Sequence, residues 1–306
     1  MKGKRNLIGA LAMLLGLGTS LVAAESYQGR FERRLQVSGP ADLEVLSRSG
    51  DVTIRAGAAG SVTILGKIRV ENRLSGDRKS DVEAIENSPP ITQNSNSIHV
   101  DYVNVRGIAI DYEITVPADS KVRSKSGSGD QTMEDLSAGL DVETGSGDVR
   151  LRNLAGEIHA HTGSGNVRAE EVAGPFEARA GSGDIRVEEK GAGDVQVETG
   201  SGNIELRGVD GGLRVSAGSG DVRAEGKPKS EWSFRTGSGN VELRVPGDAG
   251  FSVDISTGSG SVTVDHPITT TIQGRVERPP REIRGQVRGG GPEIRVHTGS
   301  GNIHIF

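Results

Sequence analysis

The sequence predicts an all-β protein folded as a single-domain parallel β-solenoid, with coils of about 18 residues and two strands per coil. The main observation is a tripeptide, Gly-Ser-Gly, that is nearly always followed by Asp or Asn and then by Val or Ile. Steps of 18 or 19 residues separate the first seven copies, and the last steps are 21 and 41 residues, the latter interpreted as two steps with one copy missing. The copies begin at Gly127, Gly145, Gly163, Gly181, Gly200, Gly218, Gly237, Gly258 and Gly299.

Alternating apolar residues between the tripeptides indicate two half-buried strands in each coil. After Gly181, a first run places Ile185 and Val187 on one side, and a second run does the same with Val195 and Val197. Both sets are expected to face a common interior. The composition agrees, because a solenoid interior is thin and only 3% of the 306 residues are aromatic. There is no Cys, so no disulfide is available to stabilise the fold.

The outward positions support the stacking of coils, because equivalent residues of stacked coils lie about 4.8 Å apart. The residue after the second apolar position runs Arg152, Glu170, Glu188, Arg207, Glu225, Arg244, Asp265, which places unlike charges on each other from Glu188 onward. The residue that closes each turn runs Asp130, Asp148, Asn166, Asp184, Asn203, Asp221, Asn240, Ser261, Asn302, so that amides interrupt the carboxylates.

Residues 1–24 have the pattern of a signal peptide. Lys2, Lys4 and Arg5 precede an apolar run, and Val22-Ala23-Ala24 offers small residues for cleavage after Ala24. A membrane anchor is the alternative, but the run is shorter than the ~20 apolar residues that span a bilayer. We therefore expect a periplasmic or secreted protein with no stable membrane insertion after cleavage.

Three further segments follow the signal peptide within one structural domain. Residues 25–126 are predicted to form an N-terminal cap and irregular first coils, with strands over 31–37, 43–46, 52–55, 61–70, 98–103 and 108–116 and a helix near 80–86. Residues 127–265 form the regular repeat coils, and residues 266–306 form a loop or lid and a final coil. The five arginines between His266 and Pro292 suggest a cationic contact site as an alternative to the lid, but Glu277 and Glu282 dilute their charge, so the lid is favoured.

The approach to the array, Ile114-Thr115-Val116-Pro117-Ala118-Asp119-Ser120-Lys121-Val122, leads into Ser126-Gly127-Ser128-Gly129-Asp130, and the chain ends with Thr298-Gly299-Ser300-Gly301-Asn302-Ile303. This combination resembles the bacterial "putative-adhesin" family of β-strand-repeat proteins over roughly residues 30 to 306. The resemblance implies a β-solenoid envelope protein, and it brings no binding residues with it.

Two alternatives involve chemistry at specific residues. Calcium-binding β-rolls have a nine-residue pattern, whereas this chain has a longer period and Asn at many turns; we expect Asp or Asn to hydrogen-bond the turn backbone instead. A carbohydrate-active β-helix would need acid and base groups in a cleft. His159 and His161 lie on one outward side without a further His in register, so they are predicted to be solvated, and Trp232 and Phe234 are predicted to be core. We expect no catalytic, cofactor-binding or metal-binding residue.

The sequence thus predicts a non-catalytic cell-envelope or secreted interaction protein, an adhesin that presents a solenoid surface to an envelope protein or a polysaccharide. The mildly acidic balance, with a formal net charge of -5, argues against nucleic acid as a partner. The alternatives are the calcium-binding or carbohydrate-active protein above, and a periplasmic scaffold or envelope sensor.

Overall fold

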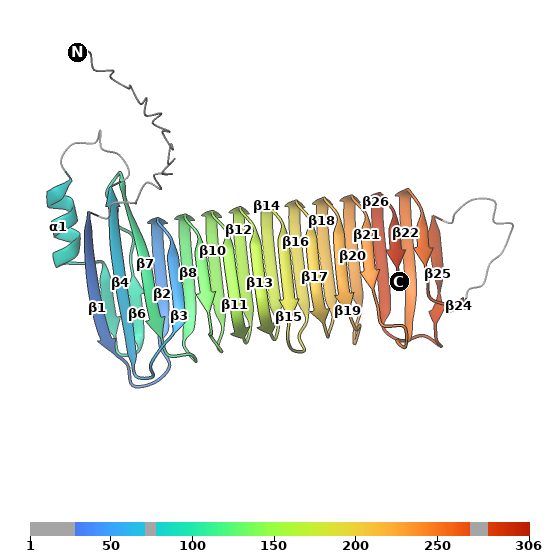
Figure 1. Cartoon of the computed structure of the whole chain (residues 1–306), viewed down its shortest axis with the longest axis horizontal. Helices are drawn as coiled ribbons and strands as arrows, with labels where there is room; N and C mark the ends of the chain where they lie inside the picture. Colours follow the sequence, from blue (N-terminus) through green and yellow to red (C-terminus); the bar gives the residue numbers. More distant parts are fainter. Residues whose placement is uncertain (1–27, 71–77, 270–280) are drawn as a thin grey trace, which may run out of the picture.

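The computed structural model describes residues 28–70, 78–269 and 281–306. The chain forms a rod of two long β-sheets that face each other, with strands running across the long axis (Figure 1). Each regular coil contributes one strand to each sheet, and strands of successive coils pair in parallel. The predicted fold class, an all-β parallel solenoid with two strands per coil, is therefore confirmed.

Within the described residues one sheet has 13 strands and the other has 14. The 13-stranded sheet consists, in spatial order, of β1 (Gly29–Gln36), β4 (Ser61–Val70), β7 (Ile108–Val116), β3 (Val52–Ala56), β9 (Gln131–Glu134), β11 (Val149–Ala155), β13 (Val167–Ala173), β15 (Ile185–Glu189), β17 (Ile204–Val209), β19 (Val222–Gly226), β21 (Val241–Arg244), β27 (Ile303–Ile305) and β23 (Val262–Val264). The 14-stranded sheet consists of β24 (Ile268–Thr269), β25 (Glu282–Val287), β22 (Phe251–Ser259), β26 (Glu293–Ser300), β20 (Trp232–Ser238), β18 (Leu213–Ser219), β16 (Val195–Ser201), β14 (Phe176–Ser182), β12 (Ile158–Ser164), β10 (Leu140–Ser146), β8 (Lys121–Ser128), β2 (Asp42–Ser49), β6 (Ser97–Val100) and β5 (Ile91–Asn94).

The interior is filled by the inward residues that the alternation predicts. Ile185, Val187, Val195 and Val197 are at most 2% exposed, and the same positions of the other coils join them in one continuous apolar core. Trp232 is fully buried, and its indole N–H donates to the carbonyl oxygen of Gly211 at 3.0 Å. The prediction that Trp232 and Phe234 are core residues is confirmed.

The N-terminal end of the rod departs from the parallel pattern. Strand β4 pairs antiparallel with both β1 and β7, and the helix α1 (Lys79–Asn87) packs against β1. The predicted strands and the predicted helix are present with small shifts in their ends. This antiparallel block covers the end of the stack, where an unpaired parallel strand would otherwise expose its backbone groups. The predicted signal peptide, 1–24, lies outside the described residues.

The turn residues form a column of hydrogen bonds along the rod. The side-chain oxygen of Asp184 accepts the backbone N–H of Asn203 at 2.7 Å, and that of Asn203 accepts the N–H of Asp221 at 3.0 Å. The same bond links every neighbouring pair of turns from Asp51 to Ser261. The expectation that Asp or Asn hydrogen-bonds the turn backbone is confirmed, and the partner lies in the adjacent coil rather than in the same turn.

The last coil of the sequence is not the last coil of the rod. Strand β26 pairs with β20 on one side and β22 on the other, and β27 lies in the same way between β21 and β23. The C-terminus therefore lies among the last coils rather than beyond them (Figure 1). The interpretation of the 41-residue step as a missing copy is wrong, because the chain continues past one position and then returns to fill it.

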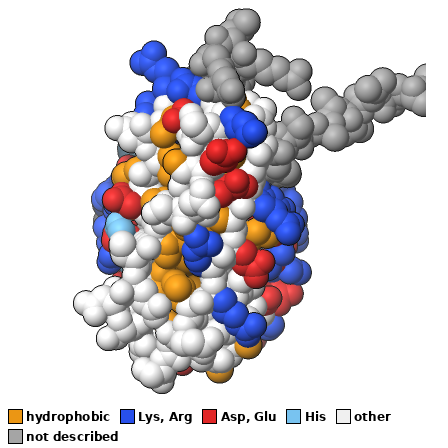
Figure 2. Space-filling model, turned by 90° about the vertical axis from the view of Figure 1, so that its left-hand side faces the viewer, with side chains coloured by type: hydrophobic (Ala, Val, Ile, Leu, Met, Phe, Trp, Pro, Cys, Tyr) orange, Lys and Arg blue, Asp and Glu red, His pale blue; other side chains and the backbone are white. Residues whose placement is uncertain are grey.

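This insertion also changes the predicted charge column. Arg244 does not neighbour Asp265; its guanidinium lies 4.9 Å from the ring centre of Phe306, and Asp265 contacts His304 at 2.8 Å. The pairing of Glu188 with Arg207 and of Glu225 with Arg244 is as predicted, but irregularities interrupt the register after Ala169 and after Leu206. Viewed from the N-terminal end, acidic and basic side chains are intermingled on both flanks (Figure 2).

The segment after β23 extends the 14-stranded sheet at its C-terminal end. Strand β25 pairs antiparallel with β22, and Arg284 contacts Asp254 at 3.1 Å and Glu282 at 3.0 Å. The described part of the predicted lid thus adds two strands to the sheet, β25 and the short edge strand β24, and the arginine of β25 is neutralised by neighbouring carboxylates. Arg275 and Arg278 lie outside the described residues.

Candidate functional site

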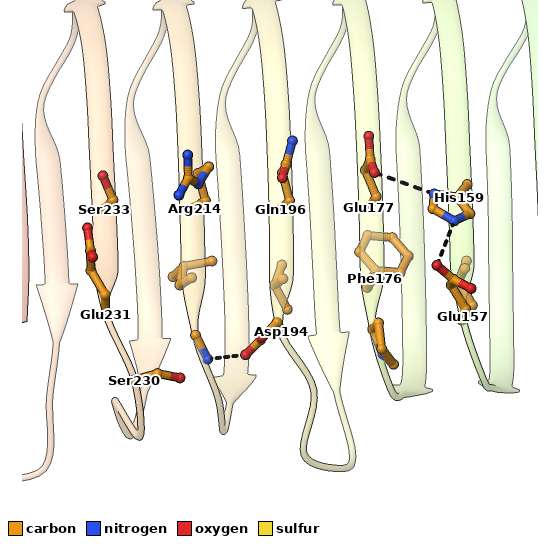
Figure 3. A pocket seen from close by; sticks show the side chains of 15 residues that line it. Glu157, His159, Phe176, Glu177, Asp194, Gln196, Arg214, Ser230, Glu231 and Ser233 are labelled. Atoms are coloured by element: carbon orange, nitrogen blue, oxygen red, sulfur yellow. Dashed lines mark hydrogen bonds and ion pairs between the residues drawn. The ribbon is translucent and has the colours of Figure 1, made fainter. Parts of the chain in front are cut away.

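A groove of about 410 Å³ lies on the outer face of the 14-stranded sheet, near the corner where each coil enters that sheet. Five outward side chains from five neighbouring strands line up along it: His159, Glu177, Gln196, Arg214 and Ser233 (Figure 3). Each is the register partner of the next, so the row is set directly by the stacking of coils. Four strand spacings make it about 19 Å long, parallel to the rod.

The carboxylates at the edges of this groove are held by neighbouring groups. His159 lies 3.3 Å from Glu157 and 3.4 Å from Glu177. One oxygen of Asp194 accepts the backbone N–H of Gly212 at 2.8 Å. Glu231 contacts Arg295 at 2.8 Å, beyond the groove. These contacts hold the carboxylates in place. The remaining polar side chains of the row, Gln196, Arg214 and Ser233, include both hydrogen-bond donors and acceptors.

Among the charged residues of the row Arg214 is the exception, because it is exposed and forms no ion pair with any described residue. Its register partners are the amide Gln196 and the hydroxyl Ser233, neither of which can neutralise a guanidinium. The five N–H donors of Arg214 are thus available to a ligand in the groove, next to an amide and a hydroxyl that can each donate and accept.

The corner beside the groove is irregular, and the sequence contains a signal for it. Ten residues separate Ile185 from Val195, whereas nine separate Val167 from Phe176. The coil from Val222 to Trp232 is longer in the same way. Both 19-residue steps of the repeat therefore place their extra residue at this corner. The period alone does not show where in the coil the extra residue lies.

The longer corner also explains a buried carboxyl group. Strands β13 and β17 contain a residue of positive φ, Glu171 at 55° and Gly208 at 73°, which interrupts the alternation before the next inward residue. Strand β15 lacks this bulge, so unbroken alternation turns Glu189 inward, opposite Val172. Glu189 is 7% exposed, and both of its carboxyl oxygens lack a hydrogen-bond partner.

Burial raises the pKa of Glu189 to about 8, and the carboxylates of Asp210 and Asp194 act in the same direction. Because the folded state holds this proton more tightly than the unfolded chain, the contribution of Glu189 to stability is fully present below the ordinary pKa of 4.5 and is lost as the pH rises to about 8. The loss is on the order of 3 kcal/mol.

We therefore expect Glu189→Gln to match the parent protein at pH 4 and to be more stable at pH 9, since the amide carries no charge to bury. The thermal unfolding midpoint measured from pH 4 to 9 checks this. Glu188→Gln is the matched control, because Glu188 is exposed on the same strand and its replacement leaves the profile unchanged. A parent-like decline in Glu189→Gln would contradict the assignment.

The structure places His159 and His161 on exposed outward positions, as predicted, with Glu143, Glu177 and Arg179 in register on the adjacent strands. No group of three or more His, Asp or Glu side chains among the described residues is arranged to hold a metal ion. Within the same residues, no helix has the length and apolar character needed to cross a bilayer. That the chain has no catalytic, cofactor or metal site stays a prediction.

Two facing parallel sheets, coils of two strands and the hydrogen-bonded turn column define the class of this molecule, a β-solenoid built of Gly-Ser-Gly coils. A family model, Toastrack DUF4097, matches residues 40–306. The chain belongs to this family. The resemblance to the bacterial "putative-adhesin" proteins is thereby confirmed. A search of curated proteins finds no match.

The chain is also similar to several solved bacterial structures. A "putative adhesin" from Parabacteroides merdae is 10% identical, with a TM-score of 0.44 and coverage of 91% of this chain and 97% of that one. A "putative adhesin" from Bacteroides fragilis is 12% identical, with a TM-score of 0.38 and coverage of 91% and 98%. A "putative cell adhesion protein" from Clostridium sporogenes is 10% identical, with a TM-score of 0.26 and coverage of 90% and 97%.

Proposed function

We propose that this chain is a non-catalytic, extracytoplasmic interaction protein that binds a polysaccharide of the cell envelope along the groove of the 14-stranded sheet. The observation that carries the proposal is the row from His159 to Ser233, which follows the rod across five coils. An extended polymer can contact His159, Glu177, Gln196 and Arg214 at once, and Ser233, which is 8% exposed, ends the row. A row that mixes acid, amide, guanidinium and hydroxyl groups suits the many hydroxyls of an uncharged glycan.

A binding role is favoured over catalysis by the state of the carboxyl groups. Glycoside hydrolysis needs one carboxylic acid that keeps its proton at neutral pH, next to a second carboxylate. Glu189, the carboxyl whose pKa is raised to about 8, lies in the interior, and Glu177 and Glu231 at the groove are held by arginines. The extracytoplasmic location rests on the pattern of residues 1–24.

The experiment compares Arg214→Ala with Arg235→Ala for binding to a panel of uncharged glycans, namely mannan, soluble glucan and chitin oligosaccharides, by isothermal titration. Arg235 is the matched control, since it is exposed on the next strand, makes no ion pair with a described residue and does not line the groove. We expect Arg214→Ala to weaken binding roughly tenfold, because it removes charge-assisted hydrogen bonds. Arg235→Ala is expected to leave binding unchanged.

If the two variants bound a glycan with equal affinity, the groove would not be the binding site. If the parent protein bound no glycan of the panel, uncharged glycans would be excluded as the ligand. Release of new reducing ends from a bound glycan would show hydrolysis and overturn the non-catalytic role. Unfolding midpoints of both variants, expected to equal that of the parent, separate lost binding from lost folding.

A further inference from the structure

A second groove, of about 430 Å³, lies on the outer face of the opposite, 13-stranded sheet. Its floor carries three arginines from consecutive strands: Arg150 on β11, Arg168 on β13 and Arg186 on β15. Arg150 is the register partner of Arg168, and Arg168 is that of Arg186, so the three lie in one column about 4.8 Å apart. We name these three residues the arginine column.

The arginine column is not explained by the stacking of coils. Like charges directly opposite each other on neighbouring strands destabilise a sheet. The adjacent column of the same sheet avoids this at most steps, with Arg152 opposite Glu170 and Glu225 opposite Arg244. Three arginines in succession therefore oppose the stability of the rod, which is the kind of local conflict found where a surface serves another purpose.

Neighbouring carboxylates contact the three arginines without enclosing them. Arg150 contacts Asp130 at 2.5 Å and Asp148 at 3.0 Å, both in the turn column. The Nε of Arg168 donates to Glu170 at 2.6 Å, and Arg186 contacts Glu205. The side chains of Arg168 and Arg186 are still 57% and 56% exposed. Each guanidinium has five donors, so donors remain for a ligand after these contacts.

We propose that the arginine column binds an acidic polysaccharide that lies along the rod. Guanidinium groups recognise carboxylates and sulfates by paired hydrogen bonds, and a column at a regular spacing matches a polymer with regularly repeated acidic groups. The rim of the groove alternates Asp148 and Asp184 with the amides of Asn166 and Asn203. This rim offers partners to sugar hydroxyls but repels a densely charged chain.

Single-stranded nucleic acid is disfavoured for two reasons. Its phosphates would approach the carboxylates of the rim, and its bases need aromatic side chains on which to stack. Among the described residues, the one large apolar side chain that is exposed is Tyr102, which does not line this groove. The inference goes beyond the proposed function, because it concerns another sheet, other residues and an acidic rather than an uncharged polysaccharide.

The test measures binding of the full mature chain to polygalacturonate by isothermal titration at low and at moderate salt, with uncharged dextran as the reference polymer. The variant is Arg168→Thr, since Thr132 and Thr263 occupy the equivalent outward position in other coils of this sheet. The matched control is Arg152→Thr, which removes an arginine of the same sheet that lies opposite carboxylates and does not line the groove.

We expect the binding of polygalacturonate to depend on Arg168 and to weaken with salt, whereas any binding of dextran should be the same in Arg168→Thr and in the parent protein. Arg168→Thr should lower the affinity at least fivefold without lowering the unfolding midpoint, whereas Arg152→Thr should leave the affinity within twofold. Binding of uncharged glycans through Arg214 should be unaffected by Arg168→Thr, so the two sites can fail separately.

Several results would overturn the inference. Equal affinity of Arg168→Thr and the parent protein would exclude the arginine column as the site. If Arg168→Thr lowered the unfolding midpoint but kept the affinity of the parent protein, the arginine column would have a structural role only. Equally tight binding of a thymidine oligonucleotide would show that the face attracts any polyanion, and the assignment to polysaccharide would be wrong.

Discussion

Replacing Leu206 by aspartate is expected to abolish cooperative folding. Leu206 is 1% exposed and lies inward on β17, between Val187 and Ala224 of the adjacent coils. A carboxylate at this position would have no cation within the apolar interior, and burying an unpaired charge removes several kcal/mol of the ~5–15 kcal/mol that stabilises a typical domain. The loss is large here because a solenoid coil is held only by its two neighbours.

Circular dichroism during chemical denaturation checks this prediction. The matched control is Arg207→Ala, one residue further along the same strand. Arg207 is 62% exposed and contacts Glu205 at 2.5 Å, so its removal should lower the free energy of unfolding by less than about 1 kcal/mol. If the two variants were equally stable, the inward and outward assignments would be wrong.

Replacing Gly183 by alanine is expected to lower the free energy of unfolding by at least about 3 kcal/mol. Gly183 has a φ of 150°, and a Cβ on it would lie 1.9 Å from the carbonyl oxygen of Gly165 in the adjacent coil. The clash is with backbone, so it is relieved only by separating the two coils. Separation would break the turn column and the strand ladders on both sides of it.

Two other glycines separate the effect of φ from the effect of space. Gly289 has a φ of 85°, but a Cβ on it would have no atom within 4 Å, and Gly247 has open space and no positive φ. Gly289→Ala should therefore cost about 1 kcal/mol and Gly247→Ala almost nothing. Thermal unfolding midpoints should be lowest for Gly183→Ala, intermediate for Gly289→Ala and highest for Gly247→Ala. Similar midpoints for all three would show that close stacking of the turns is not what requires glycine.

The surface features were only partly predictable. The outward columns follow from the repeat, and reading two positions earlier in each coil reveals the arginine column within the series Thr132, Arg150, Arg168, Arg186 and Glu205. That these arginines lie side by side depends on the strand register at Arg150, Arg168 and Arg186, which the structure provides. The groove of the 14-stranded sheet required the structure, because its hollow depends on the path of the longer corners and on the lengths of side chains around Arg214.

The sequence by itself determined the class of fold, the coil length and which residues of each strand face the interior, because period and alternation are local properties that every coil repeats. Tertiary structure decided the order of the last coils, where β26 and β27 insert between strands that precede them in the chain. The physical reason is that backbone hydrogen bonds between parallel strands are nearly identical for all coils, so the repeat does not specify which coils are neighbours. Tertiary structure also decided that Glu189 is buried, because β15 lacks the bulge residue that would turn this side chain toward solvent.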